Sequence, residues 1–274
     1  FSATYEKNIE KLASNVLSNP VVVKVENEEK VHIKQEFYYI DEENKTAFIP
    51  ALISSNKAKS ILIFCNMKIK CDKLADDLYA LGLDVLTLHS DLEQKQRDET
   101  IILFSNKSYP ILIATDVASR GLHIDDVDLV INYDLSLDEK IHTHRIGRTA
   151  RAGKGGLAIS LYTQNDFDRV EIIKETFSDI EDKSIDSVED DLSYKIDSEL
   201  RTIFINGGKK QKLRAGDILG ALTAGIGLQK DDIGKIDILD FASYVAINKE
   251  KISFVLERLS KEKIKGKYYR IYEK

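Results

Sequence analysis

The 274-residue sequence lacks any long hydrophobic run and carries only two cysteines. No apolar run approaches the roughly 18 residues that span a bilayer, and no secretory signal peptide is visible. We therefore expect no contact with a membrane. Cys65 and Cys71 have no His or Cys partner at metal-ligand spacing. This predicts no metal site, a reducing compartment, and a buried position for Cys65 within the apolar run ILIFC.

A phosphate-binding loop is also missing. The pattern Gly-x-x-x-x-Gly-Lys-Ser/Thr, whose backbone amides cradle nucleotide phosphates, does not occur in the sequence. We therefore expect that this chain alone binds no nucleotide cofactor and does not hydrolyse ATP.

The net charge of −6 conceals an uneven distribution. Residues 199–274 carry 16 Lys and Arg against 10 Asp and Glu, a net charge of +6. Residues 1–198 carry 24 against 36, a net charge of −12. A basic C-terminal region attached to an acidic body predicts that this region meets a polyanion.

Residues 35–165 alternate between strand-like and helix-like segments. Leu74, Leu78 and Leu81 recur at helical spacing, and Gly82 follows where a helix C-cap would lie. The alternation predicts an α/β domain over residues 31–174, with a doubly wound parallel sheet whose ligands bind beyond the carboxyl ends of its strands. The expected strands are EFYYI, SILIFC, DVLTLH, PILIAT, DLVINYD and GLAISLY.

The composition changes after this region. Residues 175–199 hold 10 acidic residues and 2 lysines, which predicts a solvated acidic linker with some helix at its start. Residues 200–274 then show strand, helix, strand, strand, helix and strand patterns in turn. This βαββαβ order predicts a small α+β domain of the RNA-recognition-motif type.

The segment HTHRIGRTARAGKGG, residues 142–156, has the densest charge pattern. Arg145, Arg148 and Arg151 stand three residues apart, so on a helical turn they fall on one side and can converge on one polyanion. Like charges this close repel one another, and a bound phosphate would relieve the repulsion. The alternative is a solvated basic helix without a ligand.

This segment resembles motif VI of the DEAD-box RNA helicases. SILIFCNMK resembles motif IV of the same family, Gln94 and Arg97 fit its Gln-x-x-Arg element, and ATDVASRGLHI resembles motif V. The motifs follow one another as they do in the second RecA-like domain of the family. The resemblance implies that residues 31–174 form that RecA-like domain. In a full-length parent it would close with a first RecA-like domain on ATP, Mg²⁺ and single-stranded RNA.

The resemblance also implies roles for single residues. Arg148 and Arg151 would contact the γ-phosphate as arginine fingers and carry the catalytic role. His144 and Arg145 would lie near the nucleotide and tie motif VI to neighbouring motifs, with a purely structural hydrogen bond as an equal alternative for His144.

Motifs IV and V and the Gln-x-x-Arg element supply the implied contacts with RNA. Lys68, Arg97 and Thr115 would bind the RNA backbone, which positions RNA without reading its sequence. Gly121 and His123 are assigned to the nucleotide, and Gly121 matches an RNA-contacting position as well.

Three positions depart from the family pattern. His123 replaces an Asp that contacts ribose, Met67 replaces a Thr that meets an RNA phosphate, and Ser90 replaces a Gly. We therefore expect a weaker grip on nucleotide or RNA, with activity retained. For Arg120 we favour an ion pair with Asp116 over an RNA contact.

The last 75 residues resemble the C-terminal RNA-binding domain of the DbpA subfamily. The resemblance lies in FINGGKKQKLRAGDILGALTAGIGLQKDDIGKI and KIKGKYYRIYEK. In that subfamily the domain is an atypical RNA-recognition motif that recognises a hairpin of large-subunit ribosomal RNA. The alternative for any one of the lysines is a solvated side chain. The cations assigned to RNA are Lys209, Lys210, Lys212, Arg214, Lys235, Lys263, Lys265, Lys267 and Arg270.

Aromatic residues are sparse on the central strands of this domain. Phe204 and Tyr244 occupy places where other RNA-recognition motifs stack bases, so stacking is expected to be a minor mode beside the basic loops. Tyr268, Arg270 and Tyr272 share one face of the last strand by alternation.

The chain begins with Phe1-Ser2-Ala3-Thr4. Ser-Ala-Thr is motif III near the end of the first RecA-like domain in this family. Residues 1–30 are therefore interpreted as a remnant of that domain together with the interdomain linker. The acidic DEAD tetrad is missing along with the phosphate-binding loop, so this chain alone is predicted to be inactive.

The predicted function is that of the C-terminal portion of an ATP-dependent RNA helicase. It would bind ribosomal RNA and unwind short duplexes during large-subunit assembly, as a monomer in the cytoplasm. One alternative is a non-catalytic RNA-binding adapter, which would have no reason to keep motif III. Another is a fragment of a DNA-directed helicase, against which the RNA-recognition-like tail counts.

Overall fold

The computed structural model describes residues 32–119, 124, 126–150 and 155–274. Val31–Lys274 forms one compact unit. The predictions for residues 1–30, Arg120, Gly121, His123 and Arg151 lie outside the described residues.

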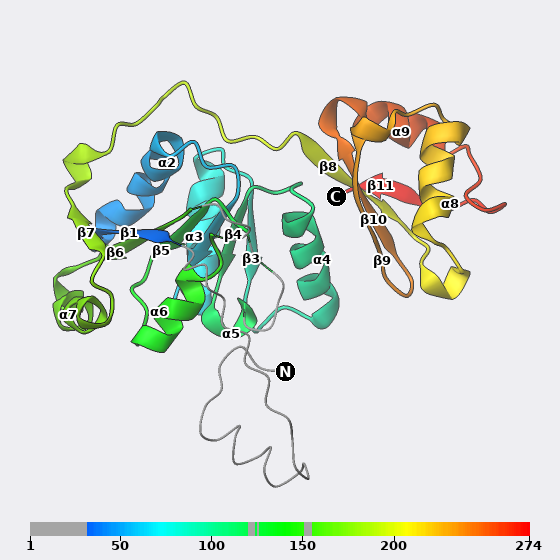
Figure 1. Cartoon of the computed structure of the whole chain (residues 1–274). Helices are drawn as coiled ribbons and strands as arrows, with labels where there is room; N and C mark the ends of the chain where they lie inside the picture. The colour runs from blue at the N-terminus through cyan, green and yellow to red at the C-terminus, as the bar shows by residue number, and fades with distance from the viewer. Residues whose placement is uncertain (1–31, 120–123, 125, 151–154) are drawn as a thin grey trace, which may run out of the picture. The chain divides into compact units, whose positions relative to one another are not determined.

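The first domain is built on a parallel sheet in the order β3-β4-β2-β5-β6-β1-β7 (Figure 1). Its doubly wound topology confirms the predicted fold class. The strands are β1 (Ile33–Tyr39), β2 (Ile61–Phe64), β3 (Val85–Leu88), β4 (Ile111–Ala114), β5 (Leu129–Asn132), β6 (Gly156–Tyr162) and β7 (Ile180–Lys183). The helices are α2 (Lys45–Ser55), α3 (Lys68–Ala80), α4 (Gln94–Ser105), α5 (Asp116–Ser119), α6 (Glu139–Ile146) and α7 (Phe167–Thr176).

Two apolar layers hold this sheet, one on each face. Alternate residues of a strand point to opposite faces, so β2 supplies Ile61 and Ile63 to one layer and Leu62 and Phe64 to the other. The first layer packs against α2 and α3, and the second against α4, α5 and α6. Because both faces are covered, the central strands are apolar throughout, and this is why short continuous runs predicted them correctly.

The segment predicted to be a solvated linker is in part packed against the first domain. Its residues Ile180–Lys183 form β7, which pairs in parallel with β1 at the edge of the sheet. Further along, the Ser54 hydroxyl donates to Asp190 at 2.6 Å and the Tyr194 hydroxyl donates to the Ala58 carbonyl at 2.8 Å. The side chains of Val188, Tyr194 and Ile196 also pack against the apolar core of this domain. A count of charges in this segment does not reveal these few apolar residues among the acidic ones.

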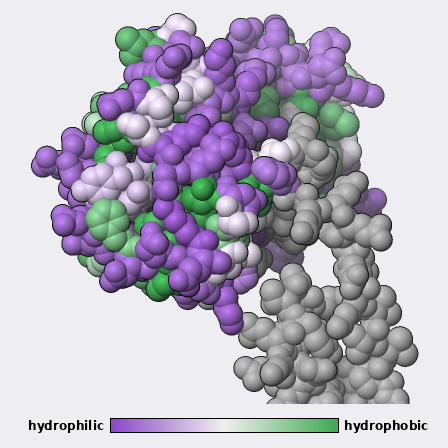
Figure 2. Space-filling view, turned by 60° about the vertical axis from the view of Figure 1, so that its left-hand side comes forward, coloured by the Kyte–Doolittle hydropathy of each residue, from purple (hydrophilic) through white to green (hydrophobic). Residues whose placement is uncertain are grey.

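The side of the molecule that carries α7 and β7 is mainly hydrophilic. Figure 2 shows hydrophobic residues on this face in small separate groups among polar ones. Apolar residues scattered in this way are ordinary for a protein surface.

The second domain is a four-stranded antiparallel sheet in the order β11-β8-β10-β9. It confirms the predicted βαββαβ order. Its elements are β8 (Leu200–Ile205), α8 (Ala215–Gly220), β9 (Ile233–Ile238), β10 (Ser243–Asn248), α9 (Ile252–Leu259) and β11 (Ile271–Glu273). One face of the sheet packs against α8 and α9 in an apolar core of its own.

Candidate nucleotide and nucleic-acid interface

Arg145 of α6 holds together the loops at the carboxyl ends of three strands. Its guanidinium donates to both carboxylate oxygens of Asp116, at 2.7 and 2.8 Å. It also donates to the Asp134 carbonyl and to the Asn66 side chain, each at 2.7 Å, and more weakly to Asn132 at 3.3 Å. The side chain is 1% exposed. A buried cation whose five N–H groups are all bonded fixes the backbone segments that supply its acceptors.

This geometry gives Arg145 an internal role. The predicted tie between motif VI and motifs IV and V is observed, because Asn66 follows β2 and Asp116 follows β4. The predicted contact between Arg145 and a nucleotide stays a prediction. All five guanidinium N–H groups already donate within the domain, so none is available to a nucleotide. Asp116, the expected partner of Arg120, is held on both oxygens by Arg145.

His144 and Arg148 lie at the surface next to this buried network. His144 is exposed and Arg148 half-buried, and both line a small pocket with Asp116 and Ser119. The turn that carries Arg148 is fixed by backbone bonds, since the Val127 amide donates to the Arg148 carbonyl at 3.3 Å. Arg148 is therefore a side chain on a rigid turn, as an arginine finger requires.

Close packing fixes the end of the same segment. A Cβ atom on Gly156 would lie 2.5 Å from the Cβ of Ala150 and 2.6 Å from the Thr149 methyl group. Residues 149 and 150 thus lie directly against the start of β6, and a larger residue at position 156 would displace them.

The three predicted RNA-backbone residues of the first domain follow neighbouring strands. Lys68 begins α3 after β2, Thr115 follows β4, and Arg97 lies in α4 after β3. Since these strands are adjacent in the sheet, their carboxyl ends place the three residues along one edge. The Arg97 guanidinium donates to the Ala118 carbonyl at 3.3 Å, and Lys68 pairs with Asp91 at 2.7 Å. The hydrogen bond from Lys68 lowers the pKa of Asp91.

The two basic clusters of the second domain form one surface. The Lys265 ammonium donates to the Lys212 carbonyl at 2.6 Å and pairs with Asp217 at 3.1 Å. Residues about fifty positions apart in the sequence are thereby brought together. All the cations predicted for these clusters are exposed. In addition, Lys263 lies 5.4 Å from the centre of the Tyr268 ring, and Tyr268 is 64% exposed.

A pair of glycines shapes the loop that carries the first cluster. A Cβ atom on Gly208 would lie 2.1 Å from the Leu239 carbonyl oxygen, and one on Gly207 would lie 2.3 Å from the Tyr269 ring. Neither position has room for a side chain. The backbone therefore approaches its neighbours closely here, and Lys209 and Lys210 follow directly, their amides donating to the carbonyls of residues 239 and 240.

Lys235 and the two aromatic residues of the central strands lie outside the two basic clusters of the second domain. Lys235 pairs with Asp237 at 3.0 Å, and its ammonium lies 3.3 Å from the Ser105 hydroxyl of the first domain. Phe204 and Tyr244 are 8% and 1% exposed. This burial agrees with the expectation that base stacking contributes little.

Sequence reasoning missed the acceptors that hold Arg145. Asn132 ends the buried strand β5, and Asn66 and Asp134 stand two residues after the ends of β2 and β5. Polar side chains at the carboxyl ends of adjacent apolar strands were the available signal, because such positions meet at one edge of a parallel sheet.

Neither a metal cluster nor a membrane-spanning helix occurs in the described part of the chain. Within the ranges that the structure describes, no group of three or more His, Cys, Asp or Glu residues could hold a metal ion. None of the helices found there has the length and apolar character needed to traverse a bilayer.

Comparison with known families and curated proteins agrees with both domains. Residues 44–153 match the Helicase conserved C-terminal domain, and residues 202–273 match the DbpA RNA binding domain. The chain is 38% identical over 272 residues to ATP-dependent RNA helicase DbpA of Escherichia coli, covering 99% of this chain and 59% of that protein. It is 34% identical over 294 residues to the Bacillus subtilis protein of the same name, covering 99% and 61%. The chain thus spans about three fifths of the length of these relatives.

Solved structures of DEAD-box proteins resemble about two thirds of this chain. The Escherichia coli protein SrmB, solved bound to regulator of ribonuclease activity A, is 32% identical with a TM-score of 0.54, covering 61% of this chain and 98% of that one. The Saccharomyces cerevisiae protein Dbp5, solved bound to RNA and ADP BeF3, is 32% identical with a TM-score of 0.59, covering 68% and 51%. With a helicase C-terminal domain followed by a DbpA RNA-binding domain, the chain belongs to the DbpA subfamily of the DEAD-box RNA helicases.

Proposed function

We propose that this chain supplies the second half of the ATP site and the RNA-targeting domain of an ATP-dependent RNA helicase. The buried Arg145 network carries the proposal. It ties the turn before Arg148 to the loops that follow β2 and β4, where Lys68 and Thr115 lie. A residue suited to phosphoryl transfer and residues suited to RNA backbone are thus fixed to one rigid centre.

In the assembled enzyme, bound ATP with Mg²⁺ would supply the transferring phosphoryl group and neutralise part of its charge. Arg148, together with Arg151, would donate to that group as charge develops on its oxygens. Lys68, Arg97 and Thr115 would hold the RNA backbone along the edge of the sheet. RNA binding and nucleotide binding would then favour the same arrangement of loops around Arg145.

The basic surface of the second domain would bind a hairpin of large-subunit ribosomal RNA and bring the helicase to it. The activity would be the local opening of short duplexes during assembly of the large ribosomal subunit, in the cytoplasm and with a monomeric protein. Without a phosphate-binding loop, residues 1–274 alone would remain inactive.

The test is to supply the missing half. The chain is fused to, or mixed with, a DEAD-box first RecA-like domain, and ATP hydrolysis is measured with and without a ribosomal RNA hairpin. We expect RNA-stimulated hydrolysis that falls by roughly 10³-fold or more in Arg148→Ala. The matched control Arg258→Ala, at an exposed position on α9, should keep the parental rate.

Two results would reject parts of the proposal. Hydrolysis that Arg148→Ala leaves intact would refute the arginine-finger role. Tight hairpin binding without any stimulated hydrolysis would identify the chain as a non-catalytic RNA-binding adapter instead.

A further inference from the structure

The sheet of the second domain has two faces with different surroundings. Ile203, Ile205 and Val245 point into the domain's own core beneath α8 and α9. Phe204 and Tyr244, directly opposite each other on β8 and β10, point to the other face. In RNA-recognition motifs this second face commonly stacks bases on its aromatic residues.

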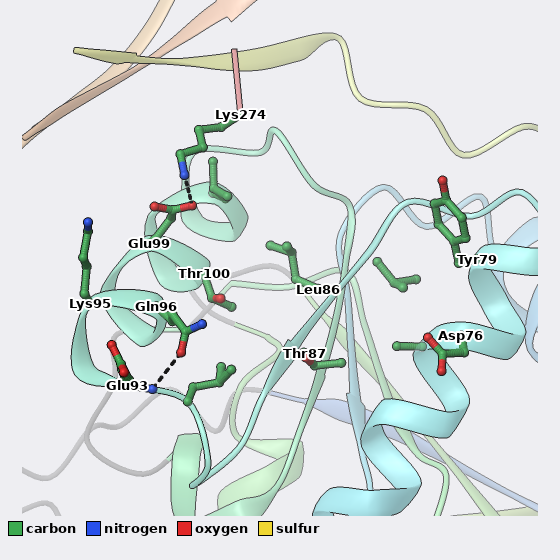
Figure 3. A pocket seen from close by; sticks show the side chains of 14 residues that line it. Asp76, Tyr79, Leu86, Thr87, Glu93, Lys95, Gln96, Glu99, Thr100 and Lys274 are labelled. Atoms are coloured by element: carbon green, nitrogen blue, oxygen red, sulfur yellow. Dashed lines mark hydrogen bonds and ion pairs between the residues drawn. The ribbon is translucent and has the colours of Figure 1, made fainter. Parts of the chain in front are cut away.

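Helix α4 of the first domain covers that second face. Ile102 of α4 packs in one apolar cluster with Phe204 and Tyr244, and all three side chains are less than 10% exposed. Glu99, one turn earlier on α4, accepts a hydrogen bond from the Tyr244 hydroxyl at 3.0 Å. Glu99 also pairs with Lys274 at 2.6 Å, at the rim of a groove lined by α3, β3 and α4 (Figure 3).

Lys274 contacts two aromatic rings of the second domain in addition to Glu99. Its ammonium lies 5.6 Å from the centres of the Phe204 and Tyr272 rings, within the range of a cation–π interaction. Tyr244 of β10 and the C-terminal Lys274 therefore both bind the Glu99 carboxylate of α4, and Lys274 is itself held against two aromatic rings of the second domain. Burial and Glu99 together raise the pKa of Tyr244, so its hydroxyl stays protonated as the donor.

A second set of polar contacts lies at the far end of the same helix. The Thr202 hydroxyl meets the Asn106 amide and the Ser108 hydroxyl, each at 2.7 Å, and these three residues are at most 3% exposed. Nearby, Arg201 pairs with Asp84 at 3.0 Å and donates to the Ser108 carbonyl at 3.1 Å. Buried polar groups that satisfy one another across an interface fix a single register between the two surfaces.

We propose that the aromatic sheet face of the second domain is the docking surface for helix α4 of the first domain, and that it stays closed to RNA bases. The buried area is made of complementary apolar and charged groups from both domains, as a specific interface requires. Stacked bases would have to displace Ile102 and leave Glu99 and Thr202 without partners. Helix α4 also carries Arg97, two residues before Glu99, so the docked helix links the two regions assigned to RNA.

The proposal is tested by measuring the distance between the domains in the full chain. Spin labels are attached at Lys73→Cys on α3 and Lys261→Cys, both exposed positions, while Cys65 and Cys71 are 0% exposed and so react poorly. We expect one narrow distance distribution. Glu99→Lys should raise the undocked fraction roughly tenfold or more, because it buries like charges beside Lys274.

Charge exchange and a matched control make the result specific. Adding Lys274→Glu to Glu99→Lys should restore much of the narrow distribution. Glu257→Lys, at an exposed position of α9, should leave the parental distribution unchanged. Tyr244→Phe keeps the ring and removes the bond to Glu99, so it should broaden the distribution less than Glu99→Lys. A broad parental distribution, or one that Glu99→Lys does not change, would overturn the proposal.

The same labelled chain is then titrated with a ribosomal RNA hairpin, with binding followed by fluorescence anisotropy. A distribution that stays narrow when RNA is bound supports the closed face. If RNA binding instead gave the parental chain the broad distance distribution of Glu99→Lys, RNA would have opened the sheet face, and the proposal would be refuted. Failure of the hairpin to bind would refute the proposed RNA-targeting function, while the distances without RNA would still decide the docking.

Discussion

At the scale of single residues, His142 is a buried neutral histidine two positions before motif VI's exposed His144. Its Nε2 lies 2.8 Å from the Gln35 side-chain oxygen, and its ring is fully buried beside Phe37 and Phe177. Among the described residues, its Nδ1 has no hydrogen-bond partner. Burial, and then the positive charge of Arg145, lowers the pKa of His142 to about 4.

A pH dependence of stability follows from this burial. In the unfolded chain a histidine takes up its proton near pH 6.5, whereas folded His142 does so only near pH 4. The unfolded state thus binds more protons between these values, and the free energy of unfolding falls as the pH drops through this window. We expect His142 to account for a loss of about 2 to 3 kcal/mol between pH 7 and pH 4.5.

The measurement compares urea unfolding of the parent and His142→Gln at several pH values. The variant loses packing at every pH, but its unfolding free energy should depend less steeply on pH between 6.5 and 4.5. If the unfolding free energies of the parent and the variant changed equally with pH in this window, the lowered pKa assigned to His142 would be contradicted.

At the scale of single elements, the Gly207-Gly208 turn after β8 depends on close backbone approach. At Gly208 an added Cβ would meet backbone atoms of residues 239, 240 and 242, all within 2.8 Å. Backbone cannot move aside as a flexible side chain can. At Gly216 in the first turn of α8, an added Cβ would meet nothing within 4 Å.

These two glycines give a matched pair of Gly→Ala substitutions. Gly208→Ala should lower the free energy of unfolding by about 2 kcal/mol or more and weaken hairpin binding, because Lys209 and Lys210 leave their positions. Gly216→Ala should be neutral or stabilise by up to about 1 kcal/mol through lower entropy of the unfolded chain. Thermal unfolding and anisotropy titrations of both variants check this, and equal behaviour would refute the steric argument.

The same elements show what the sequence could and could not predict. Buried strands such as β2 and β4 were found because an uninterrupted apolar run is itself the mark of a strand covered on both faces. Strand β7 was missed because its edge position leaves it few apolar residues among many acids. The hydrogen bonds of Arg145 and the contact between Tyr244 and α4 join residues that are far apart in the sequence. Local periodicity cannot predict such partners.

At the scale of the whole molecule, the charge is divided between the two domains. The basic surface of the second domain belongs to a region of net charge +6, and the remainder of the chain has −12. If RNA responded to total charge, an acidic protein would repel it. Affinity for a hairpin would therefore depend on the few lysines that touch phosphates, each of which releases counterions on binding.

This predicts that the position of a charge matters more than its number. Replacing Lys209, Lys210 and Lys263 together by Gln should weaken hairpin binding and reduce the slope of log affinity against log salt by about one for each phosphate that is no longer neutralised. Replacing Lys57, Lys59 and Lys73 together by Gln removes the same total charge from exposed positions of the first domain. That triple variant should keep the parental slope in anisotropy titrations over a range of KCl concentrations. If both triple variants showed the same reduction in slope, binding would follow net charge, and the basic surface of residues 209–214 and 263–270 would not be the RNA site.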